Sequence, residues 1–133
     1  MTPVFLDTVG LVAVWDRTDQ WHQAAAETYL RLLQQRRPLL TTSLIFLECG
    51  NATARRPYRS RVNVLRQVFI KTKQLIEPTT EDIESAWTAF ECGDAAQAGI
   101  VDHVSFAVMR RLGVAEAFTN DRHFTAAGFT TLF

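Results

Sequence analysis

The stretch Val4-Phe5-Leu6-Asp7-Thr8 decides the expected fold. Three apolar residues stop abruptly at a carboxylate, which is the pattern of a short buried strand. Similar apolar runs follow at residues 39–41, 75–76, 115–118 and 130–133, and segments of helical periodicity separate them. Strands that alternate with helices predict right-handed crossovers and a parallel sheet covered on both faces. We therefore expect one α/β domain over residues 1–133, a three-layer sandwich whose central sheet is mostly parallel.

The helix boundaries have their own signals. A first helix follows Asp7, and Pro57 separates a helix that starts near residue 42 from a basic one. Thr79 with Asp82 three residues later resembles a capping box, which satisfies the free N–H groups at the start of a helix. The last long helix is expected over residues 101–112. This pattern puts a helix after each of the first three strands.

The composition bounds the class of protein. Of 133 residues, 47% are hydrophobic and 21% are charged, which is typical of a globular domain. No apolar run reaches the roughly 18 residues that a membrane span needs, and no signal peptide is recognisable. Cys49 and Cys92 are too few for a disulfide framework. We therefore expect a cytoplasmic protein with no membrane partner.

A net charge of zero hides a strong asymmetry. Between Glu48 and Glu77 the chain has no acidic residue but seven basic ones: Arg55, Arg56, Arg59, Arg61, Arg66, Lys71 and Lys73. From Glu77 to Asp102 it has no Lys or Arg. A basic face can hold a polyanion even on a neutral protein. The alternative is that both stretches are solvated helix faces.

Four carboxylates are the candidate site. Asp7 and Asp121 each follow a predicted strand, and Glu48 and Asp102 lie near the starts of helices. Ligands of open α/β sheets bind beyond the carboxyl ends of the strands, so these acids can converge at one edge. Asp7 could also merely cap a helix, and Asp121 could be a turn residue. Glu48 and Asp102 have apolar sequence neighbours, where an unpaired charge is costly.

Clustered carboxylates repel one another, and a divalent cation removes that repulsion. Ligation by oxygen alone suits Mg²⁺ or Mn²⁺. Such a site can activate a water for attack on a phosphodiester and stabilise the leaving oxygen. The acids therefore predict a metal-dependent hydrolase in which no side chain acts as the nucleophile.

Four sequence blocks carry a family resemblance. They are residues 4–8, Glu48 on its helix, residues 101–109, and Phe118-Thr119-Asn120-Asp121-Arg122-His123-Phe124. In this order they resemble the signature blocks of PIN domains, and the similarity covers nearly the whole chain. The small size and the lack of an appended domain resemble the toxin half of bacterial VapBC-type toxin–antitoxin pairs.

The resemblance implies a PIN-like fold and an endonuclease for single-stranded RNA that depends on Mg²⁺ or Mn²⁺. It implies that Asp7, Glu48, Asp102 and Asp121 form the metal-binding quartet. Thr119 matches the family's hydroxyl residue beside the last acid, and we include it among the catalytic residues; Thr8 matches the one after the first. The implied partners are an RNA substrate and a cognate antitoxin that reaches the acidic pocket, and we also expect a homodimer.

The chain departs from the family pattern at two places. Val9 and Gly10 stand where the family often has Ser after the first Thr, and the segment before Asp102 is rich in alanine. Two alternatives remain beside a toxin: a housekeeping PIN nuclease that processes RNA, and a degenerate PIN fold that only binds. A receiver domain would need an acidic pair and a late Lys, and a dehalogenase-type phosphatase would need an acid at Val9.

Several other residues have a structural and a functional interpretation. We expect His103 on a helix surface or in the core, and we expect His123 to pack or to cap, rather than either to be a ligand. Trp21 and Trp87 fall at helical spacing, which favours core packing over base stacking. Arg122 could touch a phosphate or be a surface cation.

Overall fold

The computed structural model describes residues 1–133. Its centre is one five-stranded sheet in the order β3-β2-β1-β4-β5, and every neighbouring pair is parallel. The strands are β1 (Val4–Leu6), β2 (Leu39–Thr42), β3 (Leu75–Ile76), β4 (Glu116–Phe118) and β5 (Thr130–Thr131). The predicted α/β fold is confirmed, and the sheet is wholly rather than mostly parallel.

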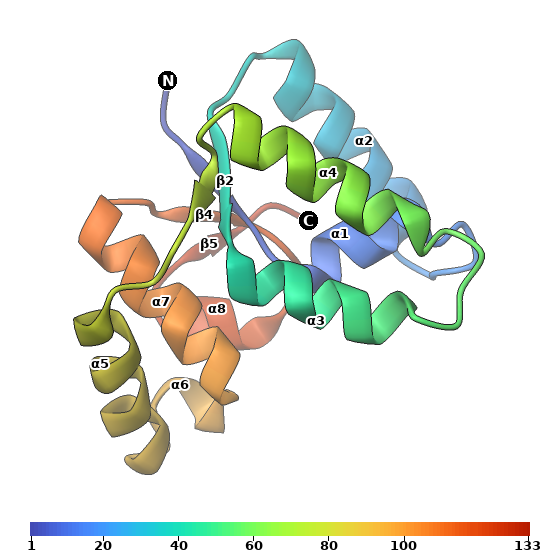
Figure 1. Ribbon diagram of the computed structural model, residues 1–133. Helices are drawn as coiled ribbons and strands as arrows, with labels where there is room; N and C mark the ends of the chain where they lie inside the picture. The colour runs from blue at the N-terminus through green and yellow to red at the C-terminus, as the bar shows by residue number, and fades with distance from the viewer.

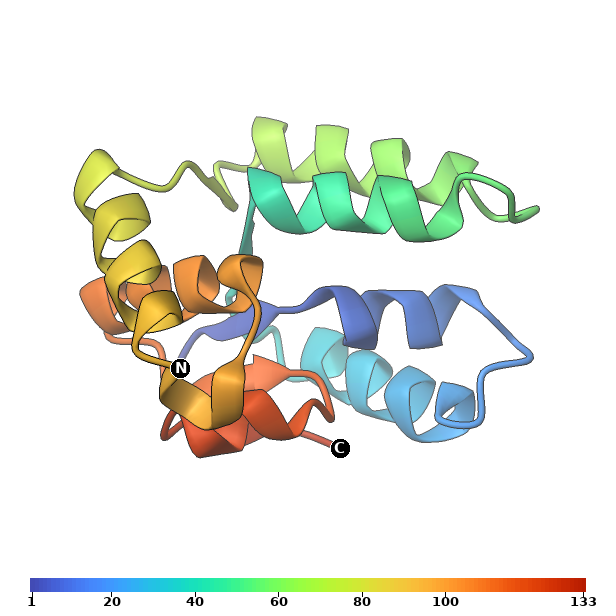
Figure 2. The same ribbon diagram turned by 90° about the horizontal axis from the view of Figure 1, so that it is seen from below.

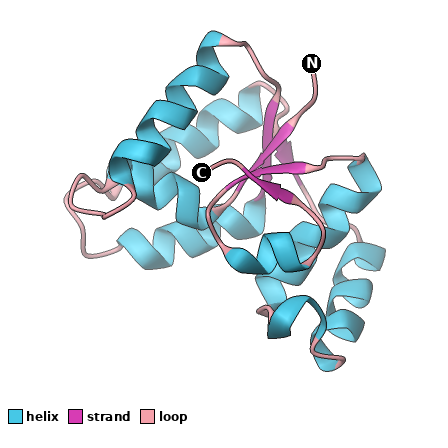
Figure 3. Ribbon diagram, turned by 180° about the vertical axis from the view of Figure 1, so that it is seen from behind, coloured by secondary structure: helices cyan, strands magenta, loops and turns pink.

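Eight helices cover the sheet in two groups. The first group is α1 (Thr8–Trp15), α2 (His22–Gln34), α3 (Ser43–Thr53) and α4 (Ser60–Lys71). The second group is α5 (Thr80–Glu91), α6 (Asp94–Gln97), α7 (Ile100–Leu112) and α8 (Arg122–Ala126). Within the groups α1 packs on α2 and α3, α5 packs on α7, and α6 packs on α8. Figures 1 and 2 show the two groups apart, and Figure 3 shows the strands between them.

The central strand of the sheet is fully apolar. Val4, Phe5 and Leu6 of β1 are completely buried, as a central strand of a doubly covered parallel sheet should be. Phe118 of β4 is buried beside them, and Leu6 pairs with Phe118 in register. Residues that directly follow β1 and β4 therefore emerge side by side from the core.

The strand order reverses between β1 and β4. The chain first runs outwards from β1 through β2 to β3, and then returns past β1 to β4 and β5. Such a switch point opens a crevice at the carboxyl ends of the strands, because the two connections leave in opposite directions. Asp7 and Asp121 both lie at this point. The topology thus brings together residues that are far apart in the sequence.

The predicted capping box is present. The Thr79 hydroxyl accepts a hydrogen bond from the Asp82 N–H at 3.0 Å, and the Asp82 carboxylate accepts one from the Thr79 N–H at 2.9 Å. Arg111 of α7 also donates to both oxygens of Asp82, at 2.8–3.1 Å. The box therefore starts α5 and also ties it to α7.

The expected burial of two tryptophans is wrong. Trp21 is 47% exposed and Trp87 is 46% exposed. On α5 the residues that face inwards are Asp82 and Ala86. Consecutive helix positions point about 100° apart, so the inward direction at Ala86 turns Trp87 towards solvent.

Gly10 permits a close approach between α1 and β4. A Cβ atom at this position would lie 2.2 Å from the carbonyl oxygen of Phe118. That oxygen belongs to the backbone of a central strand, so it cannot move aside cheaply. Any residue larger than glycine would push the start of α1, and Asp7 with it, away from the end of β4.

We predict that Gly10→Ala destabilises the protein by about 1–3 kcal/mol, the usual cost of overpacking a core. Gly50→Ala is the matched control, because Gly50 lies in α3 with nothing within 4 Å of an added Cβ. Alanine at a helix interior is favoured over glycine by about 1 kcal/mol, so this control should stabilise. Urea unfolding of the three proteins measures both effects, and a change of the same sign in the two variants would contradict the explanation.

Candidate active site

The four predicted acids meet in one cleft. Asp7 is the N-cap residue of α1, Glu48 lies on α3, Asp102 is in the first turn of α7, and Asp121 is the N-cap residue of α8. The cleft has a volume of about 590 Å³. Its other lining residues are Thr8, Val9, Asn51 and Ala52. The predicted convergence of the acids is therefore present, although Glu48 lies in the middle of α3 and not near its start.

Asp7 is the most buried of these acids, with 1% of its surface exposed. The Thr119 hydroxyl donates a hydrogen bond of 2.8 Å to its Oδ2 atom. Burial is the main reason that the pKa of Asp7 rises to about 7, and the charges of Asp102 and Asp121 raise it further, although Thr119 lowers it. Near neutral pH this carboxyl group is therefore partly protonated, and a metal cation can displace its proton.

Asp102 is half-buried and is coupled to its neighbours. Burial raises its pKa to about 6, the carboxylates of Asp121 and Glu48 add to the rise, and His123 opposes it. These couplings follow from negative charges brought close together in a partly dry site. His123 is thus the one group beside these acids that offsets their repulsion, and it does so only in part.

Two threonine hydroxyls orient the carboxylates. Thr8 donates to Oε1 of Glu48 at 2.7 Å, so residues 40 positions apart are joined across α1 and α3. The Thr119 hydroxyl, besides donating to Asp7, accepts from the Asp121 N–H at 3.1 Å. Both threonines that the family resemblance implied thus touch the acids. Such contacts fix the orientation in which a carboxylate meets a cation.

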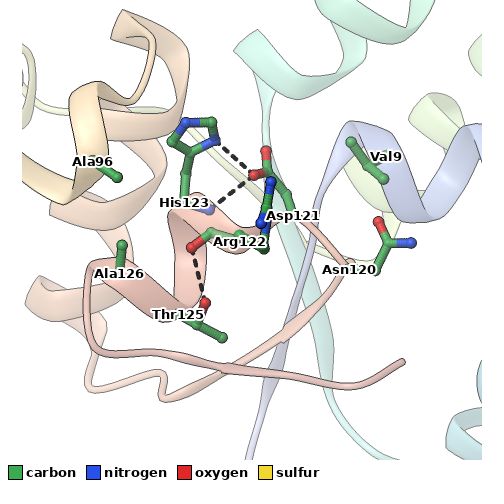
Figure 4. Close-up of a pocket in the computed structure, with 8 residues that line it drawn as sticks. All are labelled: Val9, Ala96, Asn120, Asp121, Arg122, His123, Thr125 and Ala126. Carbon is green, nitrogen blue, oxygen red and sulfur yellow. Dashed lines mark hydrogen bonds and ion pairs between the residues drawn. The ribbon is translucent and has the colours of Figure 1, made fainter.

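His123 contacts one of the acids, so its role goes beyond the packing or capping that the sequence favours. Its Nδ1 atom lies 2.7 Å from Oδ1 of Asp121, and its backbone N–H donates to the same oxygen at 2.9 Å. Figure 4 shows the ring turned towards Asp121. The sequence signal was an imidazole two positions after an acid at a helix start. His103 is buried as expected and packs edge-on against Phe106.

The chemistry of the site suits a hard divalent cation. Asp102, Asp121 and His123 can each offer a ligand atom, and these atoms all lie within 4.8 Å of one another. Asp7 and Glu48 add oxygen donors to the same cleft. Oxygen-rich sites of this kind favour Mg²⁺ and Mn²⁺, and one imidazole fits Mn²⁺ as well. The acidic cluster could therefore bind a metal ion.

Comparisons with known proteins identify relatives of the chain. No protein-family model matches the chain. The chain is 31% identical over 128 residues, 95% of each sequence, to the 23S rRNA-specific endonuclease VapC20 of Mycobacterium tuberculosis. The crystal structure of that VapC20, described as a toxin that cleaves the sarcin-ricin loop, superposes with a TM-score of 0.80 at 27% identity and covers 96% of both chains.

Two more distant structures share the fold. DNA-bound VapBC from Salmonella typhimurium superposes with a TM-score of 0.65 at 15% identity, covering 98% of this chain and 97% of the other. FitAcB from Neisseria gonorrhoeae gives a TM-score of 0.65 at 13% identity, covering 98% and 96%. At this identity the likeness concerns the architecture alone.

We predict that the affinity for Mg²⁺ or Mn²⁺ rises steeply between about pH 5 and pH 8. The pKa values of about 7 for Asp7 and about 6 for Asp102 mean that a cation must displace protons in this range. Calorimetry in buffers of different ionisation enthalpy should show proton release near pH 6, and none above about pH 8.

Asp7→Asn and Asp94→Asn provide the comparison for this prediction. In the metal-free wild type, the raised pKa of Asp7 makes the folded chain bind more protons than the unfolded one, so stability falls as pH rises from about 4 to 7. Asp7→Asn should lessen that fall and weaken metal binding. Asp94 is exposed on α6, and its variant should behave like wild type. Equal metal affinity in the two variants would refute a role for Asp7.

Proposed function

We propose, because the chain belongs to the VapC family of PIN-domain toxins, that it is a metal-dependent endoribonuclease and the toxin of a toxin–antitoxin pair. The single observation that supports this most is the convergence of Asp7, Glu48, Asp102 and Asp121 in one cleft. We assign these four acids as the ligands of Mg²⁺ or Mn²⁺, and Thr119 as the hydroxyl that orients Asp7.

The contacts of each residue indicate its role in the site. A divalent cation in the cleft would offset the repulsion among the acids and stabilise negative charge on a phosphodiester. Thr119 holds Asp7 and the start of α8 together, and Thr8 holds Glu48 against α1. His123 fixes one oxygen of Asp121 and leaves the other free to bind. These contacts pre-organise the acids, so little rearrangement is needed when an ion arrives.

We propose ribosomal RNA as the substrate, because VapC20 carries the name of a 23S rRNA-specific endonuclease. Such a substrate would place the action of the protein in the cytoplasm. A second cleft of about 600 Å³ adjoins the acids, since Asn51 and Ala52 line both. Arg55 and Arg56 line this second cleft. Their guanidinium groups suit the phosphates of a strand that crosses the acids.

An antitoxin would dock in a separate apolar groove between α1, α2 and α4. The groove has a volume of about 400 Å³. Its lining residues are Leu11, Val14, Trp15, Tyr29, Ser60, Arg61, Val64, Leu65 and Val68. An amphipathic segment can lay its apolar face into such a groove, and an Arg or Lys beyond it could reach the acids.

The groove includes residues of α1 but none of α3. Trp15 lines it, whereas Leu47 is 65% exposed on α3 and is not among the lining residues. We propose that the exposed pair Trp87 and Phe90 on α5 lies in the interface of a homodimer. Sedimentation of the isolated chain would test whether the dimer forms. No helix of the structure has both the length and the apolar character needed to cross a membrane.

We predict that Asp102→Asn abolishes cleavage of ribosomal RNA in Mg²⁺ or Mn²⁺. Residues that merely support a metal ligand contribute about 10–100-fold, so loss of a ligand should cost more. Asp94→Asn is the control with the same change of charge, and it should cleave like wild type. Gel analysis of the RNA fragments measures both, and expression in a bacterial host tests whether arrest of growth follows cleavage.

Three outcomes would separate the alternatives to a toxin. RNA binding without cleavage by wild type would favour a PIN fold that only binds. Cleavage without arrest of growth would favour a housekeeping nuclease. Arrest by Asp102→Asn as strong as that by wild type would show that toxicity does not come from the acidic cleft.

We predict that the groove and the basic cleft can be disabled separately. Val64→Asp should abolish binding of the antitoxin encoded beside this chain and leave cleavage intact, because Val64 is 65% exposed and makes no part of the acidic cleft. Arg55→Ala with Arg56→Ala should do the reverse. Each lost phosphate contact should flatten the salt dependence of RNA affinity by about 0.7 log units per log unit of salt. If both variants lost both activities equally, the two surfaces would not be distinct.

A further inference from the structure

We propose that a pocket beside the acidic cleft binds the nucleotide next to the cleaved phosphodiester, with Arg122 on its phosphate and Asn120 on its base. This inference rests on the proposed function, because it takes single-stranded RNA as the ligand. The pocket, which we call the α8 pocket, has a volume of about 890 Å³. It is lined by Val9, Ala96, Asn120, Asp121, Arg122, His123, Thr125 and Ala126 (Figure 4).

The α8 pocket is continuous with the acidic cleft. Val9 and Asp121 line both, so a group in the pocket lies directly against one of the proposed metal ligands. The cleft therefore has an open space on each side: the cleft of Arg55 and Arg56 on one, and the α8 pocket on the other. A polymer that is cut in the middle needs room for its chain on both sides of the cut bond.

Arg122 is available to bind an anion. It is exposed at the start of α8 and forms no ion pair, although the Asp121 carboxylate is its neighbour in sequence. His123 already occupies the oxygen of Asp121 that faces this helix. A guanidinium group presents five donors in a fork that matches a phosphate, which a lysine cannot do. The charge of Arg122 thus favours the backbone of a nucleic acid in this pocket.

Asn120 has the chemistry to recognise a base. It is half-buried between β4 and α8, and its side-chain amide makes no hydrogen bond within the protein. An amide offers both donors and an acceptor, so it can pair with the edge of an unstacked base. Val9 is 39% exposed and lies near Asn120 in Figure 4, where its apolar side chain can contact the face of the base.

The far wall of the pocket is built from an unusual backbone. Ala95, Ala96 and Gln97 have φ values of 52°, 55° and 61°, so α6 is a left-handed turn of residues that normally avoid this conformation. α6 packs on α8, and the small side chain of Ala96 faces the pocket. Such strain persists only where neighbouring structure holds it, and it is common at ligand sites. The volume of the pocket, about 890 Å³, has room for a nucleotide.

The test compares Arg122→Ala with Arg36→Ala. Arg36 is an exposed arginine shortly before β2, so it lies at the amino ends of the strands, whereas the acids lie at the carboxyl ends. RNA affinity is measured without divalent cations, so that the RNA stays intact, over a range of salt concentrations. Arg122→Ala should weaken binding of all sequences alike and flatten the salt dependence by about 0.7 log units per log unit of salt. Arg36→Ala should change neither.

Asn120→Ala tests the second half of the proposal. It should leave the salt dependence unchanged but reduce the preference for one base next to the cut bond by about fivefold or more, the value of a good side-chain contact to a base. Cleavage of an RNA set that varies each flanking position measures this preference. Metal affinity by calorimetry should equal that of wild type for both variants, and Arg122→Gln serves if Arg122→Ala does not fold.

Failure of this inference is distinguishable from failure of the proposed function. Absence of RNA cleavage by wild type counts against the endoribonuclease, whereas the binding assay needs no cleavage. If Arg122→Ala matches Arg36→Ala in RNA affinity and salt dependence, the phosphate contact is overturned. If Asn120→Ala keeps the base preference of wild type, the base contact is overturned.

Discussion

The structure depends on one buried carboxylate at the end of the most buried strand. Asp7 continues directly from Val4, Phe5 and Leu6, so the central strand carries it into a place where a charge has almost no water. An isolated charge in such a place is expensive, which is why its pKa rises to about 7. The Thr119 hydroxyl compensates only in part. The fold tolerates this cost because the rest of β1 is apolar and fully packed.

The elements around Asp7 are arranged to bring other acids to it. Gly10 lets α1 lie against the carbonyl of Phe118, which sets the distance between the ends of β1 and β4. Thr119 then joins Asp7 to the start of α8. The result is a group of carboxylates that raise the pKa values of Asp7 and Asp102, and His123 offsets this effect only in part. Binding of a cation would relieve the repulsion among these carboxylates. Groups whose pKa values are shifted in this way are typical of functional sites.

The sheet also separates surfaces that differ in charge. The basic residues from Arg55 to Lys73 lie on α4 or within a few residues of its ends, and the acidic stretch from Glu77 lies mainly on α5, in the other group of helices (Figure 1). Net charge therefore says little about where a polyanion would bind. The positions that matter are local: Arg55 and Arg56 on one side of the acids, and Arg122 on the other. The apolar groove near Trp15 lies apart from the α8 pocket, so a partner and RNA need not compete for the same side chains.

The sequence by itself determined the parallel sheet, the four acids and the capping box of Thr79 and Asp82, because apolar runs, helical periodicity and cap residues are local patterns. Only the tertiary structure decided the rest. Periodicity shows which residues share a helix face but not how the helix is rotated on the sheet, so Trp21 and Trp87 turned out exposed. The need for glycine at position 10 and the hydrogen bond from Thr119 to Asp7 depend on distances between elements. Those distances are fixed by packing over the whole molecule, which no stretch of sequence encodes alone.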